Sequence, residues 1–202
     1  MMTRIQSSLH ALRFRPHGQV HSDAPLGMLR RIGFQMSAAA TIGCAGDVLQ
    51  QALEGKASVD ELDVARSARL ATYRCVQAPI ADASWSAFDR WFRHLPGAPG
   101  VVAKIVADQV LLMPPFVAAF FLSQGAMEGM SFDACVERTR AGFWPTACAS
   151  CPFWSAVHVI TFSVVPPVYR VPWTSSVAVF WNAFMSRQNQ LAIASEHASA
   201  PS

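Results

Sequence analysis

A long apolar segment near the C-terminus constrains this chain more than any other feature. From Ala141 to Ser186 the segment carries a single formal charge, Arg170. About 20 apolar residues are enough to cross a bilayer as one helix, so a run of this length predicts a membrane span, a break and a second apolar helix. Pro166 and Pro167 mark the break, because proline cannot continue a helix. Much of this protein is therefore expected to be surrounded by lipid.

The composition agrees with a membrane protein. The 202 residues are 52% hydrophobic and only 14% charged, whereas about a quarter of the residues in a soluble domain are charged. The mean hydropathy of +0.26 is only mildly positive, which favours several spans whose polar groups face one another. The net charge of +3 comes from scattered basic residues without an aromatic-lined stripe, so it gives no indication of nucleic-acid binding.

Four membrane spans are predicted within one polytopic, all-α helical domain at residues 25–188. They cover residues 32–53, 70–92, 101–124 and 144–165. Residues 171–186 follow as a shorter apolar helix that spans the membrane, lies at the interface or packs back on the bundle, so five spans are the alternative. Residues 189–202 are expected to form a flexible tail. Counting basic residues on each side weakly favours both termini on the non-translocated side.

The basic N-terminal segment, residues 1–24, has the composition of a targeting sequence. Residues 1–22 contain no acid, and Arg4, Arg13 and Arg15 are accompanied by serines and histidines. An arginine-rich, acid-free amphipathic segment is typical of a mitochondrial presequence, whereas the apolar core of a secretory signal is missing. The alternative is a disordered basic tail in the cytosol.

Ionisable side chains inside the predicted spans carry most of the functional information. Each costs roughly 2.5–3.5 kcal/mol in a bilayer, and those that persist usually face a partner or water. Asp47 shares a helix face with small residues, which let a neighbouring helix approach closely. Asp82 and Asp89 lie on one polar face of the second span. Lys104 and Asp108 stand four residues apart, the spacing of an ion pair on a helix surface.

Two roles remain open for the polar residues of the spans. They either line a water-filled path for small solutes or pair across helices to fix one packing arrangement. The candidate residues are Asp47, Gln50, Arg66, Arg69, Asp82, Lys104, Asp108 and Gln109.

No catalytic motif stands out. The chain has no Gly-x-Ser-x-Gly elbow, phosphate loop or His-Glu-x-x-His, so we expect no enzymatic activity, no cofactor and no metal. Cys148 and Cys151 form a Cys-x-x-Cys, but a metal site would need further ligands and redox chemistry a thioredoxin-like context. No ligand residues are spaced around His158, which is expected to be hydrogen-bonded between helices.

Several motifs follow one another in a fixed order along the chain. They are Gly46-Asp47 with Gln50 and Gln51; Asp63, Arg66 and Arg69; Lys104, Asp108, Gln109 and Pro114; and a C-terminal signature of Trp144, Pro145, Trp154, Phe162, Pro166, Arg170, Trp181 and Asn182. In this order the motifs resemble the family of the MPV-seventeen protein and the twenty-two-kilodalton peroxisomal membrane protein, over residues 25–187. The chain departs from the family pattern at Ser155, His158 and Thr161, so pore selectivity does not carry over from the resemblance.

The resemblance implies an integral helical protein of the mitochondrial inner membrane, with the peroxisomal membrane as the alternative. It further implies a weakly selective channel for small solutes that contributes to mitochondrial metabolite and DNA homeostasis. The other interpretation is a structural or assembly subunit of a membrane complex without transport activity. The expected partners are the lipid bilayer, small-solute permeants, and a homo-oligomer or membrane complex.

Overall fold

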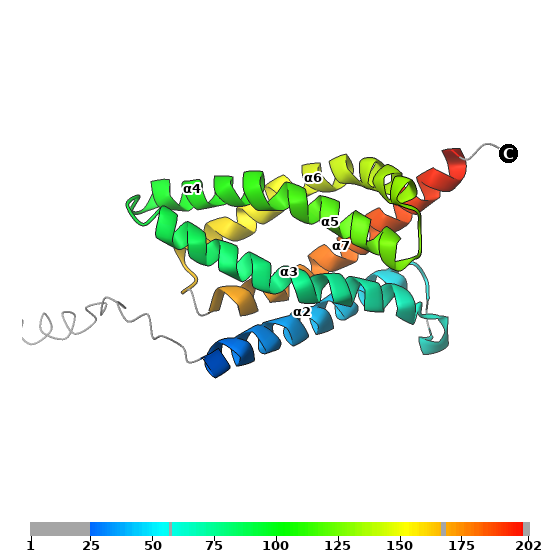
Figure 1. Ribbon diagram of the computed structural model, residues 1–202, viewed down its shortest axis with the longest axis horizontal. Coiled ribbons are helices and arrows are strands. Elements are labelled where there is room, and N and C mark those ends of the chain that lie inside the picture. Colours follow the sequence, from blue (N-terminus) through cyan, green and yellow to red (C-terminus); the bar gives the residue numbers. More distant parts are fainter. Residues whose placement is uncertain (1–24, 57, 167–168, 200–202) are drawn as a thin grey trace, which may run out of the picture. The chain divides into compact units, whose positions relative to one another are not determined.

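The computed structural model describes residues 25–56, 58–166 and 169–199 (Figure 1). The elements within these ranges are α2 (Pro25–Leu53), the short 3-10 turn η2 (Val59–Glu61), α3 (Val64–Trp91), α4 (Ala98–Ala107), the π-helical turn η3 (Asp108–Leu112), α5 (Met113–Met127), α6 (Phe132–Ser163) and α7 (Arg170–Ser199). No strand occurs among these described residues, and the predicted all-α class is confirmed. The targeting segment predicted at residues 1–24 lies outside the described ranges. The chain divides into the units Met1–Arg31 and Ile32–Ser202, and the helix bundle belongs to the second unit.

Two helical stretches have the length and composition needed to cross a membrane. They are Ile32–Leu53 in α2 and Ala98–Met127, which includes α4, η3 and α5. These stretches correspond to the first and third predicted spans. The second and fourth predicted spans fall in α3 and α6, which are 28 and 32 residues long but less apolar. The count of four spans therefore stays a prediction.

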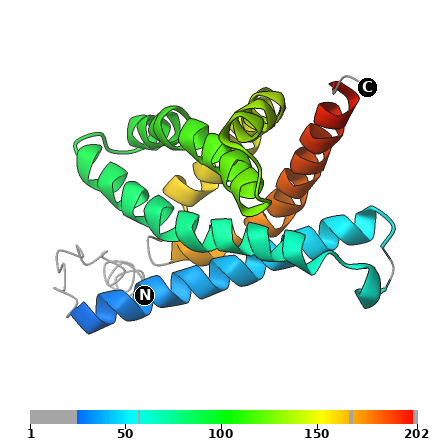
Figure 2. The same cartoon turned by 45° about the vertical axis from the view of Figure 1, so that its right-hand side comes forward.

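The predicted break in the C-terminal apolar segment is present, but α7 extends further than expected. Helix α6 ends at Ser163 and α7 begins at Arg170, with Pro166 between them. Helix α7 then continues to Ser199 as one helix, orange to red in Figure 2, so the prediction of a flexible tail from residue 189 is wrong. Asn189 and Ala192 are each only 4% exposed. The helix continues because residues 173–199 contain no glycine or proline and end in good helix formers such as alanine, leucine, glutamine and glutamate.

A π-helical turn interrupts the third predicted span. Pro114 and Pro115 have no backbone N–H, and a proline ring inside an α-helix clashes with the carbonyl four residues earlier. The chain accommodates them with a wider turn in which the Met113 N–H donates to the Asp108 carbonyl, five residues back. Such turns are frequent at functional sites. Here the turn carries Asp108 and Gln109, which are both buried.

The apolar core lies where α3, α5 and α7 meet. Its buried members are Leu70, Val117, Phe120, Phe121, Met185 and Ala192. Helices α5 and α6 form an antiparallel hairpin (Figure 1), which turns at Gly129 with a backbone φ of +78°. Gly142 of α6 lies directly against the Phe121 ring, where a Cβ atom would overlap it. The absence of a side chain at residue 142 thus lets α5 and α6 pack closely.

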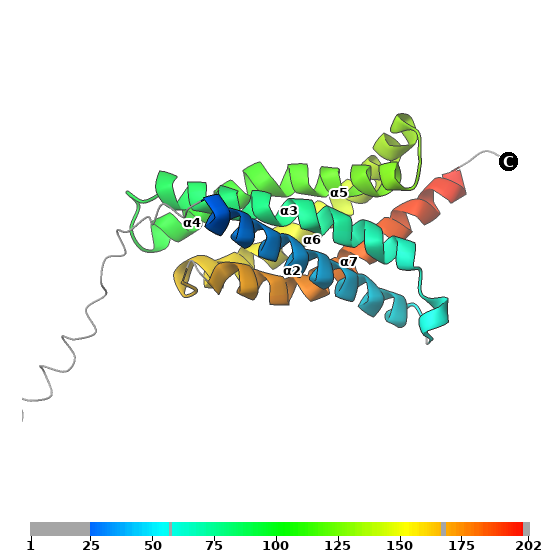
Figure 3. The same cartoon turned by 60° about the horizontal axis from the view of Figure 1, so that its bottom comes forward.

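Glycines also bring α2 into close contact with α3 and α7. A Cβ atom on Gly46 would lie 2.5 Å from the Asn182 Cβ and 2.8 Å from the Val179 carbonyl oxygen of α7. A Cβ atom on Gly43 would lie 2.9 Å from the Arg74 Cγ of α3. Figure 3 shows the stretch of α2 beyond Ile32 passing over α3 and α7. The small-residue face predicted around Asp47 is therefore confirmed as a helix-packing face.

Replacing Gly46 with alanine is expected to destabilise the bundle. The new methyl group would overlap the backbone and Asn182 side chain of α7, and overpacking of this kind costs about 1–3 kcal/mol. Thermal unfolding of the purified chain in detergent measures the effect. The matched control is Gly33→Ala on the same helix, because nothing lies within 4 Å of that position. If Gly46→Ala unfolds at the same temperature as Gly33→Ala, the close contact between α2 and α7 is refuted.

Candidate functional site

A buried carboxylate, Asp47, joins α2 to α3 and α7. The side chain is 0% exposed. Its Oδ1 accepts a hydrogen bond from the Arg66 Nε at 2.8 Å and another from the Ser186 hydroxyl. Its Oδ2 accepts from the Gln51 Nε2 at 2.8 Å and from the Ser67 Oγ at 2.6 Å. Both oxygens are thus fully engaged with partners from three helices, and Asp47 faces no open space.

The Arg66 guanidinium extends this network to the end of α2. Its Nη1 and Nη2 donate to the two carboxylate oxygens of Glu54 at 2.7 and 3.0 Å, and Nη2 also donates to the Ser186 Oγ at 2.8 Å. Gln50 donates to the same Glu54 carboxylate at 3.2 Å. The hydrogen bonds from Arg66 hold the pKa of Glu54 below its ordinary value of 4.5, against burial, which acts to raise it. Asp47, Gln50 and Arg66 therefore belong to one interhelical network.

One ion pair fastens the α5–α6 hairpin to α3, and a second closes the hairpin itself. The Oε1 of Glu128, at the turn of the hairpin, lies 3.2 Å from the Nη2 of Arg69 on α3, and the Oε2 pairs with Arg138 of α6. Arg69 is one of the candidate polar residues, and its observed role is to connect helices.

Lys104 does not pair with Asp108, contrary to the prediction from their spacing. Instead, the Lys104 Nζ lies 2.5 Å from one oxygen of Asp89 on α3, and the Arg170 Nη1 lies 2.5 Å from the other oxygen. Both cations also approach the Phe162 ring, at 5.6 and 5.2 Å from its centroid. The helix is regular between the two residues, since the Asp108 N–H donates to the Lys104 carbonyl. They do not pair because each has partners on other helices.

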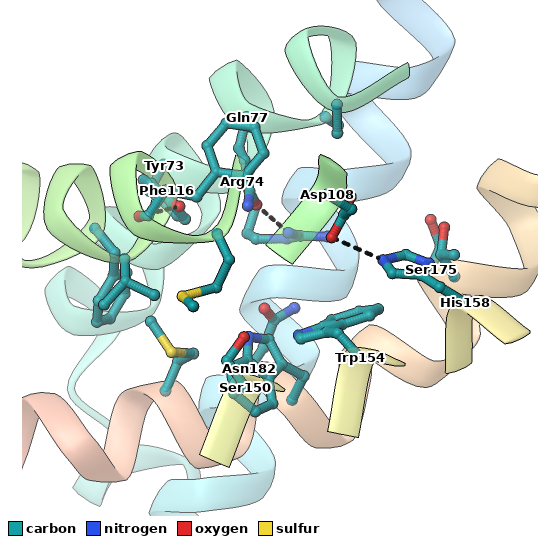
Figure 4. A pocket seen from close by; sticks show the side chains of 18 of the residues that line it. Tyr73, Arg74, Gln77, Asp108, Phe116, Ser150, Trp154, His158, Ser175 and Asn182 are labelled. Atoms are coloured by element: carbon teal, nitrogen blue, oxygen red, sulfur yellow. Dashed lines mark hydrogen bonds and ion pairs between the residues drawn. The ribbon is translucent and has the colours of Figure 1, made fainter. Parts of the chain in front are cut away.

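Asp108 is instead surrounded by hydrogen-bond donors from α3 and α6. Its Oδ1 accepts from the Trp85 Nε1 at 2.8 Å, and its Oδ2 accepts from the Gln109 Nε2 at 3.1 Å. The His158 Nε2 lies 3.2 Å from the same Oδ2 (Figure 4). His158 is 2% exposed and stacks on Trp154 with ring centroids 5.6 Å apart. The expected placement of His158 as a polar contact between helices is confirmed.

A cavity of about 100 Å³ opens beside Asp108, between α3, η3, α5, α6 and α7 (Figure 4). A single water needs roughly 10–15 Å³ of such space, so the cavity has room for several. Its polar lining residues are Arg74, Gln77, Asp108, Gln109, Ser150, His158, Thr174, Ser175 and Asn182. The remaining lining is largely aromatic and apolar, with Tyr73, Met113, Phe116, Phe120, Trp154, Trp181 and Met185. This cavity is the candidate functional site.

The structure brings only part of the predicted residue set to the cavity. Of the candidate polar residues, Asp108 and Gln109 line it, whereas Asp82 is half-buried on α3 and is not among the lining residues. Three residues of the C-terminal signature, Trp154, Trp181 and Asn182, also line the cavity. Arg170 instead pairs with Asp89 and lies over the Phe162 ring. The other three lie elsewhere: Trp144 is 70% exposed, Pro145 is inside α6, and Pro166 is in the break before α7.

Arg74 and Gln77 of α3 are functional candidates that the sequence patterns did not predict. Both line the cavity, and the Arg74 Nη1 donates to the Gln77 Oε1. The available signal was an arginine inside a predicted span with no acidic residue within four positions on either side. Such a residue cannot find a counter-charge on its own helix.

Cys148 and Cys151 are both exposed on α6. Over residues 25–56, 58–166 and 169–199, no three histidine, cysteine, aspartate or glutamate side chains are grouped so as to hold a metal ion.

Removing the charge of Asp47 should destabilise the bundle. Asp47→Asn leaves Arg66 with one counter-ion fewer and disturbs the donors from Ser67 and Ser186, and breaking a buried ion pair costs about 3 kcal/mol or more. The unfolding temperature in detergent should fall by several degrees. The control is Asp60→Asn, the same chemical change at an exposed position. Equal unfolding temperatures for the two variants would refute the structural role of the Asp47 network.

Comparison with known proteins assigns the chain to a family. Residues 125–186 match the Mpv17 / PMP22 family, and this range contains the C-terminal signature. The chain is 33% identical over 157 residues to Protein SYM1 of Mycosarcoma maydis, with 77% of each chain covered. It is 33% identical over 147 residues to Protein SYM1 of Gibberella zeae, which covers 71% of this chain and 82% of the relative.

A mammalian protein is also similar. Peroxisomal membrane protein 2 of Bos taurus is 28% identical over 146 residues, covering 70% of this chain and 74% of the relative. No solved structure shows a significant match. The extent and identity of the matches to relatives agree with the resemblance seen in the ordered motifs. The chain therefore belongs to the Mpv17 / PMP22 family of organelle-membrane proteins.

Proposed function

We propose that this chain forms a weakly selective pathway for small solutes through an organelle membrane. The observation that carries the proposal is the polar cavity between α3, η3, α5, α6 and α7. Ionisable groups at membrane depth are costly and usually mark a partner or an aqueous path. Arg74, Asp108 and His158 reach this cavity, and its volume of about 100 Å³ suits water and small solutes.

The chemistry of the lining supports weak selectivity. Groups of both charge signs, Arg74 and Asp108, face the same space as the neutral Ser150 and Asn182 and several aromatic rings. Selectivity in a pore follows from its diameter and from the charges and hydrogen-bonding groups that line it. A mixed lining of this kind discriminates chiefly by size, with charge as a secondary influence.

The proposed location is the mitochondrial inner membrane, and the proposed role is a contribution to mitochondrial metabolite and DNA homeostasis. The arginine-rich, acid-free residues 1–22 support mitochondria. The similarity to a protein named for the peroxisomal membrane supports a peroxisomal channel as the alternative. The proposal involves no enzymatic reaction.

The bilayer is the proposed partner of an apolar surface on α4 and η3. Val102, Val106 and Val110 are each more than half exposed and repeat every four residues. This row lies beside Pro99 and Leu111, and together they border an apolar groove. Acyl chains match that chemistry, and a second copy of the chain packed along the same surface would make a homo-oligomer.

A structural subunit is the second candidate function. The observation in its favour is a set of ion pairs between residues far apart in the chain: Asp47 with Arg66, Arg69 with Glu128, and Asp89 with Lys104. On this alternative, those residues stabilise the fold and line no path. The chain would then assemble with a membrane complex and the cavity would remain closed.

Filling the cavity should abolish conductance if the first proposal is correct. Ala78 lines the cavity, so Ala78→Trp places a bulky ring in the path. Purified wild-type protein reconstituted in a planar bilayer is expected to conduct small ions, and Ala78→Trp to lose most of that conductance. The control is Val76→Trp on the same helix, because Val76 is 57% exposed. Absence of conductance in correctly inserted wild-type protein would favour the structural subunit, as would equal conductance in both variants and the wild type.

The location is tested by organelle fractionation with and without residues 1–22. The full chain is expected in the mitochondrial inner-membrane fraction, and the shortened chain should be depleted from it. Resistance to alkaline extraction distinguishes integral from peripheral association. Recovery of the full chain with peroxisomal markers would overturn the mitochondrial proposal and favour the alternative.

A further inference from the structure

Arg74 differs from the other basic side chains of the bundle interior. Ion pairs with carboxylates are made by Arg66, Arg69, Lys104, Arg138 and Arg170. For Arg74 the structure gives no carboxylate partner among the described residues; its Nη1 donates to the neutral amide oxygen of Gln77. A cation held at membrane depth without a counter-charge is costly, so a ligand that supplies the missing charge would be stabilised there.

The Arg74 guanidinium has an unsatisfied edge whose two N–H groups match a carboxylate. Gln77 occupies Nη1, whereas the buried Nε has no hydrogen-bond partner. No described residue accepts a hydrogen bond from Nη2 either. The parallel N–H groups of Nε and Nη2 form the fork that binds both oxygens of a carboxylate.

The position of this fork is fixed by packing of the arginine stem. Arg74 Cγ lies 2.9 Å from the place where a Cβ atom of Gly43 would be, so the stem passes against the bare backbone of α2. The stem is thus restrained by α2, and Arg74 lines the cavity beyond it. A pre-positioned guanidinium loses less conformational entropy on binding than a mobile one.

Asp108 makes no ion pair with Arg74, although it lines the same cavity. Its two oxygens are engaged with Trp85, Gln109 and His158. In Figure 4 the dashed lines join Arg74 to Gln77 and Asp108 to His158, and none joins Arg74 to Asp108. The buried His158 Nδ1 has no hydrogen-bond partner and adds a second unsatisfied polar atom to the lining. Arg74 is thus the charged group of the cavity with an unsatisfied hydrogen-bonding edge.

We propose that the cavity binds a small organic carboxylate, held by the Nε and Nη2 edge of Arg74. The apolar part of such a molecule would contact the ring faces of Phe116, Trp154 and Trp181, which line the same space. A volume of about 100 Å³ restricts the ligand to a few carbon atoms. This inference rests on the proposed function and deepens it, since it names the class of solute that the pathway prefers.

Binding is tested first on the wild-type chain purified in detergent, by calorimetric titration. Acetate is the probe, and acetamide is its neutral isostere of nearly the same shape. Acetate should bind saturably and at least tenfold more tightly than acetamide. Equal affinities for the two would overturn the proposal. Inorganic phosphate is titrated in parallel, and tighter binding of phosphate than of acetate would overturn the assignment to a carboxylate.

Variants then assign the binding to Arg74. Arg74→Gln should weaken acetate binding at least tenfold, and Arg74→Lys several-fold, because lysine keeps the charge but lacks the fork. The control is Arg93→Gln, which removes an exposed arginine just beyond the end of α3. Unchanged acetate affinity in Arg74→Lys and in Arg74→Gln would overturn the proposal. If Arg74→Gln fails to fold, Arg74→Lys and the acetate–acetamide comparison on the wild type decide the question.

Binding and conduction are measured separately, so failure of the inference differs from failure of the proposed function. A chain that conducts but binds acetate and acetamide equally keeps the pathway and loses the carboxylate site. A chain that binds acetate through Arg74 but does not conduct keeps the site and loses the pathway.

Discussion

The buried carboxylate of Asp47 is the interaction on which the arrangement of α2, α3 and α7 depends. Four donors from three helices converge on its two oxygens. Such convergence is possible only because Gly43 and Gly46 let the helix backbones approach each other. Close backbone contact and buried polar pairing are the two forces that hold helices together in lipid, where the hydrophobic effect contributes nothing between them. The same contact with Gly43 also directs Arg74 toward the cavity, so the packing of α2 determines the geometry of the candidate site.

The charges of the bundle divide into those that hold it together and those that remain available. Most of the buried basic side chains form ion pairs with carboxylates, and Asp89 pairs with both Lys104 and Arg170. A polar residue in a membrane helix is therefore not by itself a sign of a pore. What distinguishes the cavity is a cation with an unsatisfied hydrogen-bonding edge that lines an empty space, and among the described residues only Arg74 combines the two.

Sequence patterns predicted the features that depend on local chemistry. The break before α7 follows from Pro166, and the inward face of Asp47 follows from its small neighbours, because each depends on residues a few positions away. Partners that depend on the mutual orientation of helices were not predictable in this way. The spacing of Lys104 and Asp108 fitted a pair on one helix, yet both found partners on other helices. Arg74 was overlooked because its importance arises from what surrounds it in space, and the C-terminal extension of α7 was underestimated because its polar composition resembled a tail.

The π turn lies beside the cavity and carries two of its polar lining residues, Asp108 and Gln109. Up to Asp108 the helix is regular, because the Asp108 N–H donates to the Lys104 carbonyl. Lys104 and Asp108 therefore lie on one face, and they remain unpaired because Asp89 on one side and Trp85 and His158 on the other offer partners from other helices. Regularity ends only beyond Asp108, where Pro114 and Pro115 cannot supply the N–H groups that a continuous helix needs. The wider turn that accommodates them starts at Asp108. An acid thus lines the same space as Arg74, yet its hydrogen bonds go to Trp85, Gln109 and His158 and it makes no ion pair with that arginine.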